Sequence, residues 1–234
     1  IKPYVMDWDE SQHFPKEVLQ KAGEYGFMGI LVPEEYGGSG LGYHEYVAII
    51  DEISRVDPSI GLSIAAHNSL CTNHIYKFGS NDHHKKYLKL LATGKMIGAW
   101  ALTEPNTGSD SGKMASTAVK KGNKWVLNGT KHFISHADIA DFTIAFMASG
   151  EENTSRGPKK LITAFFVDKG TPGFEIRRGY KNVSHRGYTN SILEFNNCKL
   201  PQSSVLGDMH AGFDVANSWL GATRLQVAAT CLGR

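Results

Sequence analysis

The most informative stretch of the sequence reads Trp100-Ala-Leu-Thr-Glu-Pro-Asn-Thr-Gly-Ser-Asp-Ser-Gly112. It begins with a strand pattern, and Pro105, which has no N–H, should end the pairing of that strand. Gly108 and Gly112 give the following turn backbone freedom, so successive amides and the Ser109 hydroxyl can hold an anion such as phosphate. Taken alone, a turn rich in glycine and serine is more often a surface loop than a binding site.

A second informative stretch lies downstream and reads Asn128-Gly-Thr-Lys-His-Phe-Ile-Ser135. Asn128-Gly129 separates two apolar runs and predicts the tight turn of a hairpin, because a type I′ turn needs positive φ at both central residues. Phe133 and Ser135 are two residues apart on the second predicted strand, so we expect them on one face. From spacing alone, a core aromatic and a serine at a strand end would be the more usual interpretation.

Composition narrows the class of protein. The chain has 234 residues, of which 41% are hydrophobic and 21% charged, and this fits one large domain or two smaller ones. The net charge of +2, without a basic patch, gives no support for a nucleic-acid partner, and no apolar run is long enough to span a bilayer. Three distant cysteines, Cys71, Cys198 and Cys231, indicate thiols in a reducing compartment such as the cytoplasm or the mitochondrial matrix. The histidine spacings predict no metal site.

The periodicity of apolar residues changes along the chain. Helical spacing predicts helices over residues 14–26, 43–56 and 58–78, and another after the cap at 79–82. Strand patterns follow at 97–103, 114–120, 124–128, 131–136, 141–149, 161–168, 173–178 and 190–196, with an exposed polar loop at 151–160. Residues 212–234, including Trp219, return to helical spacing.

These patterns predict an α+β fold class in three parts. An N-terminal α-helical bundle domain covers residues 1–97, and an antiparallel β-barrel or sandwich domain covers 98–209. The first helix of a third helical domain follows at 210–234.

Both quoted stretches, in this order and at this spacing, resemble the flavin-binding signatures of the acyl-CoA dehydrogenase family. The resemblance covers nearly the whole chain and implies FAD as the cofactor. In this family the matching residues lie against the isoalloxazine, the pyrophosphate or the reactive nitrogen edge of the flavin: Trp100, Ala101, Leu102, Thr103, Gly108, Ser109, Phe133, Ile134 and Ser135. The common family pattern has Trp and Thr where this chain has Phe133 and Ser135.

The resemblance also implies α,β-desaturation of an acyl-CoA thioester in fatty-acid β-oxidation, by α-proton abstraction and β-hydride transfer to the flavin. Ser109, Thr223 and Arg224 match positions that contact the acyl-CoA. Asn73 and His74 lie in a region that lines the acyl pocket in the family, and they favour a short or polar acyl chain.

The catalytic base is not apparent in the sequence. Glu104 and Asp110 flank the first stretch, but a carboxylate at a turn is more often a cap or a solvated charge, and the family uses neither as its base. A minority of the family places the catalytic Glu where Thr223 stands, and many members carry Asp where Gly221 stands. We therefore expect the base beyond Arg234, in a longer protein of which residues 1–234 are an inactive fragment.

The implied partners are an acyl-CoA substrate, an electron-transferring flavoprotein and further copies of the chain in a homotetramer. Two alternatives stay open. One is an acyl-CoA oxidase or a desulfinase-like relative on the same scaffold. The other, from a different class, is a flavin- or acyl-CoA-binding or assembly protein without catalytic activity.

Overall fold

The computed structural model describes all residues except 156, 219 and 234. The chain forms two compact units. The first, called here the helical unit, contains Ile1–Gly98, Lys181–Thr189 and the C-terminal residues 220–233. The second, called the β unit, contains Ala99–Tyr180 and Asn190–Ser218. The boundaries predicted at residues 97 and 209 remain predictions.

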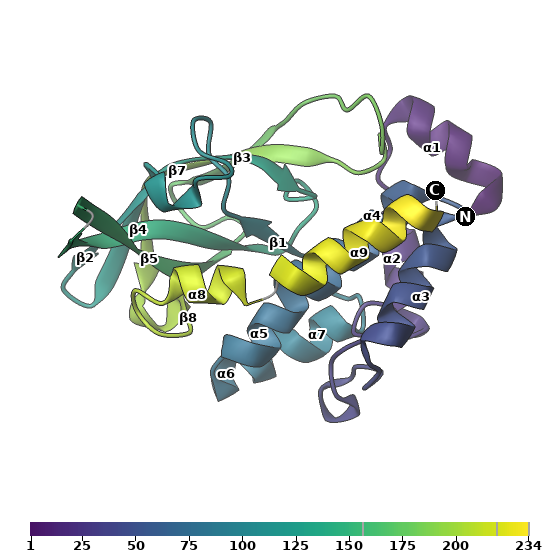
Figure 1. Ribbon diagram of the computed structural model, residues 1–234, viewed down its shortest axis with the longest axis horizontal. Helices are drawn as coiled ribbons and strands as arrows, with labels where there is room; N and C mark the ends of the chain where they lie inside the picture. The colour runs from purple at the N-terminus through teal and green to yellow at the C-terminus, as the bar shows by residue number, and fades with distance from the viewer. Residues whose placement is uncertain (156, 219, 234) are drawn as a thin grey trace. The chain divides into compact units, whose positions relative to one another are not determined.

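The helical unit contains mostly short helices (Figure 1). They are α1 (Val5–Ser11), α2 (Lys16–Glu24), α3 (Tyr43–Ser54), α4 (Pro58–Ala66), α5 (Asn73–Phe78), α6 (Asn81–His83), α7 (Lys89–Ala92) and α9 (Leu220–Gly233). The helix predicted over 58–78 is confirmed as a continuous helical run in which the π-helical segment His67–Thr72 links α4 to α5. It begins at Pro58 because Asp57 caps it, accepting hydrogen bonds from the next two free amides.

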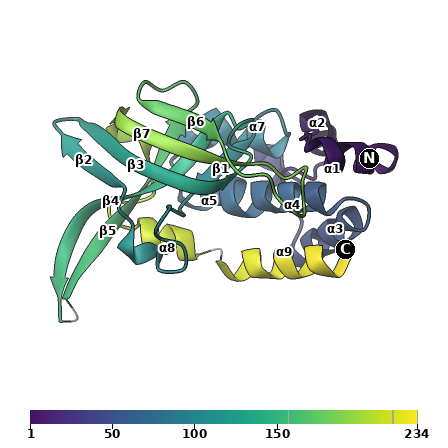
Figure 2. The ribbon, with the colours of Figure 1, turned by 90° about the horizontal axis from the view of Figure 1, so that it is seen from above.

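Buried polar side chains fix the packing inside the helical unit. The helix α9 runs beside α3 and α4 (Figure 2). The Tyr46 hydroxyl, on α3, hydrogen-bonds to the Ala65 carbonyl oxygen at 2.9 Å and to the Gln226 side chain on α9. The Asn68 amide accepts from the Ile30 N–H at 2.9 Å and donates to two carbonyl oxygens, so all of its polar atoms are used.

The β unit is a curled, mixed sheet that forms a half-barrel. Its strands are β1 (Gly98–Ala101), β2 (Thr117–Lys121), β3 (Lys124–Ser135), β4 (Phe142–Thr154), β5 (Gly157–Asp168), β6 (Phe174–Arg178), β7 (Asn190–Pro201) and β8 (Val205–Leu206). Their order is β6-β7-β3-β2-β4-β5-β8, with β1 paired to β4. The prediction of a β domain is confirmed. The pairs β2–β3, β3–β7, β4–β5, β5–β8 and β6–β7 are antiparallel, and β2 meets β4 in a parallel contact at Thr117 and Ala148.

The predicted hairpin at Asn128-Gly129 is wrong. β3 runs unbroken from Lys124 to Ser135, and the tight turn lies at 122–123, between β2 and β3. Gly129 instead adjoins a bulge in the pairing with β7 and has φ of +138°. A Cβ added there would lie 2.2 Å from the Ser116 Oγ, so the glycine serves a close approach of two backbones rather than a turn.

Two further predictions from the sequence differ from the structure. Residues 151–160 do not form a loop, because β4 and β5 continue as a long hairpin in which Glu151 pairs with Lys160 (Figure 2). Arg156, in this predicted loop, lies outside the described residues. The predicted C-terminal helix consists of two helices, α8 (Gly212–Asn217) in the β unit and α9 in the helical unit, and Trp219 between them also lies outside the described residues.

Candidate functional site

The first sequence signature lies where strand β1 leaves the sheet. β1 ends at Ala101, two residues earlier than predicted, and Leu102 and Thr103 continue beyond it. A tight turn follows, in which Glu104 and Thr107 exchange backbone hydrogen bonds of 2.9 and 3.2 Å. Gly108 and Ser109 are exposed after this turn, and a Cβ added at Gly108 would meet no atom within 4 Å. The backbone of Gly108 and Ser109 is therefore accessible to a ligand.

The second signature lies at the end of β3. The pairing with β7 shifts between Lys131 and Ile134, and Phe133 has φ of +56°. This bulge leaves 57% of the Phe133 side chain exposed, whereas Ile134 is buried in the sheet core. Positive φ is strained for an aromatic residue, and such strain is concentrated at functional sites.

An exposed aromatic cluster surrounds this bulge. The rings of Phe133 and Tyr180 lie 5.1 Å apart at 31°, and both side chains are more than half exposed. The His132 ring meets each of them, at 5.8 Å from Phe133 and 6.0 Å from Tyr180. The cluster, called here the aromatic face, exposes rings against which a planar ligand ring can pack.

The structure joins the two signatures directly. The His132 amide donates a hydrogen bond of 2.8 Å to the Thr103 carbonyl oxygen. This bond connects the segment after β1 to the bulged end of β3. Residues separated by almost thirty positions in sequence are therefore adjacent at one place on the β unit.

A buried ion pair connects the same two segments. The Lys131 Nζ lies 2.7 Å from the Glu104 Oε1, and the two side chains are 0% and 3% exposed. Burial lowers the pKa of the Lys131 ammonium to about 8, against the opposing effect of Glu104. Burial would raise the pKa of the Glu104 carboxyl, but the Lys131 charge and the hydrogen bonds from Ala115 and Ser116 hold it below its usual range.

The expected roles of the two acidic residues need one correction. Glu104 is neither a cap nor a solvated charge, because it is buried in this ion pair. Asp110 is exposed and pairs with Lys113 at 2.8 Å, as expected for a surface carboxylate. Lys131 was missed, although its spacing from Trp125 and Leu127 places it on the inward side of β3, where a lysine needs a buried partner. Tyr180 was also missed, and no pattern in the sequence singles it out.

Two hydroxyls fit a polar ligand at this place. Within the residues that the structure describes, neither the Thr103 hydroxyl nor the Ser109 hydroxyl has a hydrogen-bond partner. Each can therefore donate to a bound group without breaking an existing bond. Ala101 and Ile134 are buried in the core of the sheet, so they can meet a ligand through their backbone atoms only. Trp100 is half-buried and packs edge-on against Phe146 at 5.0 Å.

The remaining predicted residues belong to the helical unit. Thr223 and Arg224 lie on α9, where the Arg224 side chain is exposed and forms no ion pair with any described residue. Asn73 and His74 are fully buried at the start of α5, and the His74 ring stacks on Phe78.

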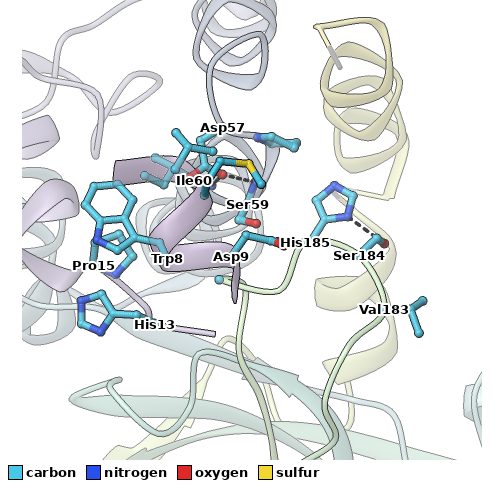
Figure 3. A pocket seen from close by; sticks show the side chains of 14 residues that line it. Trp8, Asp9, His13, Pro15, Asp57, Ser59, Ile60, Val183, Ser184 and His185 are labelled. Carbon is cyan, nitrogen blue, oxygen red and sulfur yellow. Dashed lines mark hydrogen bonds between the residues drawn. The ribbon is translucent and has the colours of Figure 1, made fainter. Parts of the chain in front are cut away.

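The helical unit also contains a cavity of about 250 Å³ near α1 and the start of α4 (Figure 3). Its polar wall includes Asp9, His13, Asp57 and the hydrogen-bonded pair Ser184 and His185. No residue of either signature lines it. Over the described part of the chain, no cluster of three or more His, Cys, Asp or Glu side chains is arranged to hold a metal ion, and no helix has the length and apolarity needed to cross a membrane.

Comparison with known proteins finds one family along most of the chain. The model for the acyl-CoA dehydrogenase N-terminal domain matches residues 1–95, and the model for the middle domain of the same family matches residues 99–198. An acyl-CoA dehydrogenase of Bacillus subtilis is 38% identical over 233 residues, and a short-chain specific acyl-CoA dehydrogenase of Clostridium acetobutylicum is 36% identical over 233 residues. Each alignment covers 100% of this chain and 60% of the relative.

A solved structure has a similar fold. A glutaryl-CoA dehydrogenase from Mycobacterium smegmatis, in complex with FADH2, matches with a TM-score of 0.90 at 29% identity, covering 100% of this chain and 57% of that one. The chain thus spans about 60% of the length of the curated relatives it matches. Together with the two domain models, which match residues 1–95 and 99–198, these similarities confirm the predicted relationship: the chain belongs to the acyl-CoA dehydrogenase family.

Proposed function

We propose that the full-length protein is a FAD-dependent acyl-CoA dehydrogenase that desaturates a short-chain acyl-CoA thioester between its α and β carbons. The observation that carries this proposal is the 2.8 Å hydrogen bond from the His132 amide to the Thr103 carbonyl oxygen. It brings the two flavin signatures together on the β unit. The short chain is supported by the relative named short-chain specific.

We assign the flavin ring to the face formed by the segment after β1 and the bulge of β3. The Thr103 hydroxyl and the backbone of residues 100–103 would hydrogen-bond the ring edge, while Phe133 would pack against the ring and exclude water. Ser135 and the backbone of Ile134 would contact the nitrogen edge. The open turn at Gly108 and Ser109 would hold the pyrophosphate through backbone N–H groups and one hydroxyl.

FAD would accept the hydride from the substrate β-carbon. The protein must provide a carboxylate that takes the α-proton and hydrogen bonds that stabilise the developing enolate oxygen. Glu104 is held in its buried ion pair, and Asp110 is exposed and paired with Lys113. We therefore assign the base to a carboxylate outside the two signatures.

For the substrate we propose contacts from Ser109, Thr223 and Arg224. The Arg224 guanidinium is exposed, and no described carboxylate neutralises it, which suits the phosphates of coenzyme A. Arg is well matched to phosphate because its planar group donates two parallel hydrogen bonds. We further propose a homotetramer that passes electrons to an electron-transferring flavoprotein, in the cytoplasm or the mitochondrial matrix.

The test is anaerobic titration of the full-length, FAD-loaded protein with a series of acyl-CoA esters from short to long. We expect short esters to bleach the visible flavin absorbance, whereas free coenzyme A, which has no α,β carbon pair, should not. No bleaching with any chain length would contradict the dehydrogenase proposal, and a shift of the flavin spectrum without bleaching would favour a non-catalytic binding protein. Rapid peroxide formation in air would favour an oxidase.

A further inference from the structure

The ion pair between Lys131 and Glu104 also forms hydrogen bonds to backbone groups around it. The Lys131 Nζ also donates to the Leu102 carbonyl oxygen at 3.2 Å. The Glu104 carboxylate also accepts from the Ala115 amide at 2.6 Å and from the Ser116 amide at 3.1 Å. Each buried charge is therefore hydrogen-bonded to backbone as well as to the opposite charge.

These contacts reach both ends of the turn. Glu104 lies before the turn, while Ala115 and Ser116 lie after it, so the Glu104 carboxylate closes residues 105–114 into a loop. Lys131 fixes this closed loop to β3, two residues before the bulge at Phe133. One ion pair thus connects the segment 102–103, the exposed turn at 108–109 and the aromatic face.

Burying two charges is unfavourable, and an apolar pair of similar size often gives equal or greater stability. Such pairs are best explained where they fix one arrangement of the chain rather than where they add stability. Here the arrangement that is fixed is the spacing between the proposed ring contacts and the proposed pyrophosphate contacts. A dinucleotide binds both at once, so its affinity depends on that spacing.

We propose that Lys131 and Glu104 are positioning residues for FAD, which hold the pyrophosphate turn and the flavin face at the separation that the dinucleotide requires. This inference rests on the proposed function, because it takes FAD as the ligand. It adds that two residues without direct contact to the cofactor set its affinity and the environment of its ring.

The test uses the full-length apoprotein and four variants: Lys131→Met, Glu104→Gln, the double variant with both changes, and Arg177→Met. The double variant removes both charges but keeps an oxygen on Gln to accept from the two amides. Arg177 forms an ion pair with Glu194 on neighbouring strands of the same unit, and both side chains are partly exposed, so Arg177→Met is the matched control. The readouts are the apoprotein unfolding midpoint, the FAD Kd from flavin fluorescence, and the visible spectrum of the bound flavin.

We expect each single variant to lower the midpoint and weaken FAD binding at least about tenfold, which is about 1.4 kcal/mol. The double variant should recover most of the midpoint but not the FAD affinity, and its bound flavin should have an altered spectrum. The control should match the wild type in all three readouts.

A double variant that binds FAD with the affinity and spectrum of the wild type would overturn the inference, and would show that the pair is only structural. If the single variants do not fold, the double variant decides alone. A wild-type protein that binds no FAD would instead overturn the proposed function, so the two failures are distinguishable.

Discussion

Replacing Gly129 by alanine tests whether the backbone of β3 passes as close to Ser116 as the structure shows. A Cβ at this position would lie 2.2 Å from the Ser116 Oγ, 2.4 Å from its Cβ and 2.6 Å from its Cα. All three distances are far below van der Waals contact, and rotating the Ser116 side chain moves only its Oγ, so the contacts with its Cβ and Cα cannot be relieved in this way. Gly129 also has φ of +138°, which only glycine adopts readily.

The expected loss of stability is the sum of two effects. Backbone strain at such a φ costs about 1–3 kcal/mol, and forcing an extra carbon into a packed contact costs about 1–3 kcal/mol more. We therefore expect Gly129→Ala to lower the free energy of unfolding by about 4 kcal/mol. Gly122→Ala is the matched control, because Gly122 has φ of +61° with no atom within 4 Å of the added Cβ, and should cost about 1–2 kcal/mol.

The assay is denaturant unfolding of the full-length protein, followed by thermal unfolding. At about 2–4 °C per kcal/mol for a domain of this size, Gly129→Ala should lower Tm by about 8–16 °C. Adding Ser116→Gly removes the two nearest atoms and should recover about 1 kcal/mol. Gly129→Ala no more destabilising than Gly122→Ala would refute the close approach of these two backbones and restore the possibility of a turn at Asn128-Gly129.

Three further predictions follow from single side chains. Ser109→Ala removes one hydrogen bond to a charged group, worth about 1.5–3 kcal/mol, and should weaken FAD binding about 10- to 100-fold in a fluorescence titration; an unchanged Kd would remove Ser109 from the pyrophosphate site. Burial lowers the pKa of His67 to about 4, so its contribution to stability is complete above the unfolded pKa of about 6.5 and is lost as the pH falls toward 4. The free energy of unfolding should therefore fall by about 2 kcal/mol between pH 7 and pH 5 in the wild type, and by less in His67→Gln. An equal fall in the two proteins would contradict a buried neutral imidazole. Tyr46→Phe leaves the Gln226 side chain without the Tyr46 hydroxyl, while the Ala65 carbonyl oxygen still accepts from the Ser69 hydroxyl. The change should cost about 1–3 kcal/mol in denaturant unfolding, whereas a change within about 0.5 kcal/mol, typical of a surface substitution, would contradict it.

The positions of β1 and of the following turn could be predicted because their signals are local. Pro105 and Gly108 act on their own backbone, so the sequence alone places an open turn there, although β1 itself ends earlier, at Ala101. The helix from Pro58 was predictable for the same reason, since its cap and its first residue are adjacent.

The interpretation of Asn128-Gly129 failed because the same dipeptide serves two purposes. In a turn, glycine is needed for its φ, and in a strand it is needed where another backbone comes close. What decides between them is Ser116, twelve or thirteen residues away, and no local pattern contains that information. The polar stretch 151–160 misled for a related reason, because a hairpin exposed at its tip lacks alternating apolar residues. The Lys159 Nζ lies 3.1 Å from the Glu152 Oε1 across the two strands. Opposite charges at facing positions are typical of paired strands and are the signal that indicates them here.

The turn at Gly108 and Ser109 could be expected from the sequence, whereas the side chains that connect it to β3 could not. The ion pair that connects the two signatures joins positions 27 residues apart. A lysine on the inward side of β3 was visible in the sequence, whereas its partner was not. The strained backbone of Phe133 likewise depends on the pairing of β3 with β7, which only the folded sheet defines.

Hydrogen exchange of the full-length protein, compared with and without FAD, tests most directly whether the two signatures act as one cofactor site. Peptides covering residues 100–112 and 129–136 should become protected together, and to a similar extent, as FAD is added. Protection confined to one of the two stretches, or located elsewhere in the chain, would contradict a single site built from both.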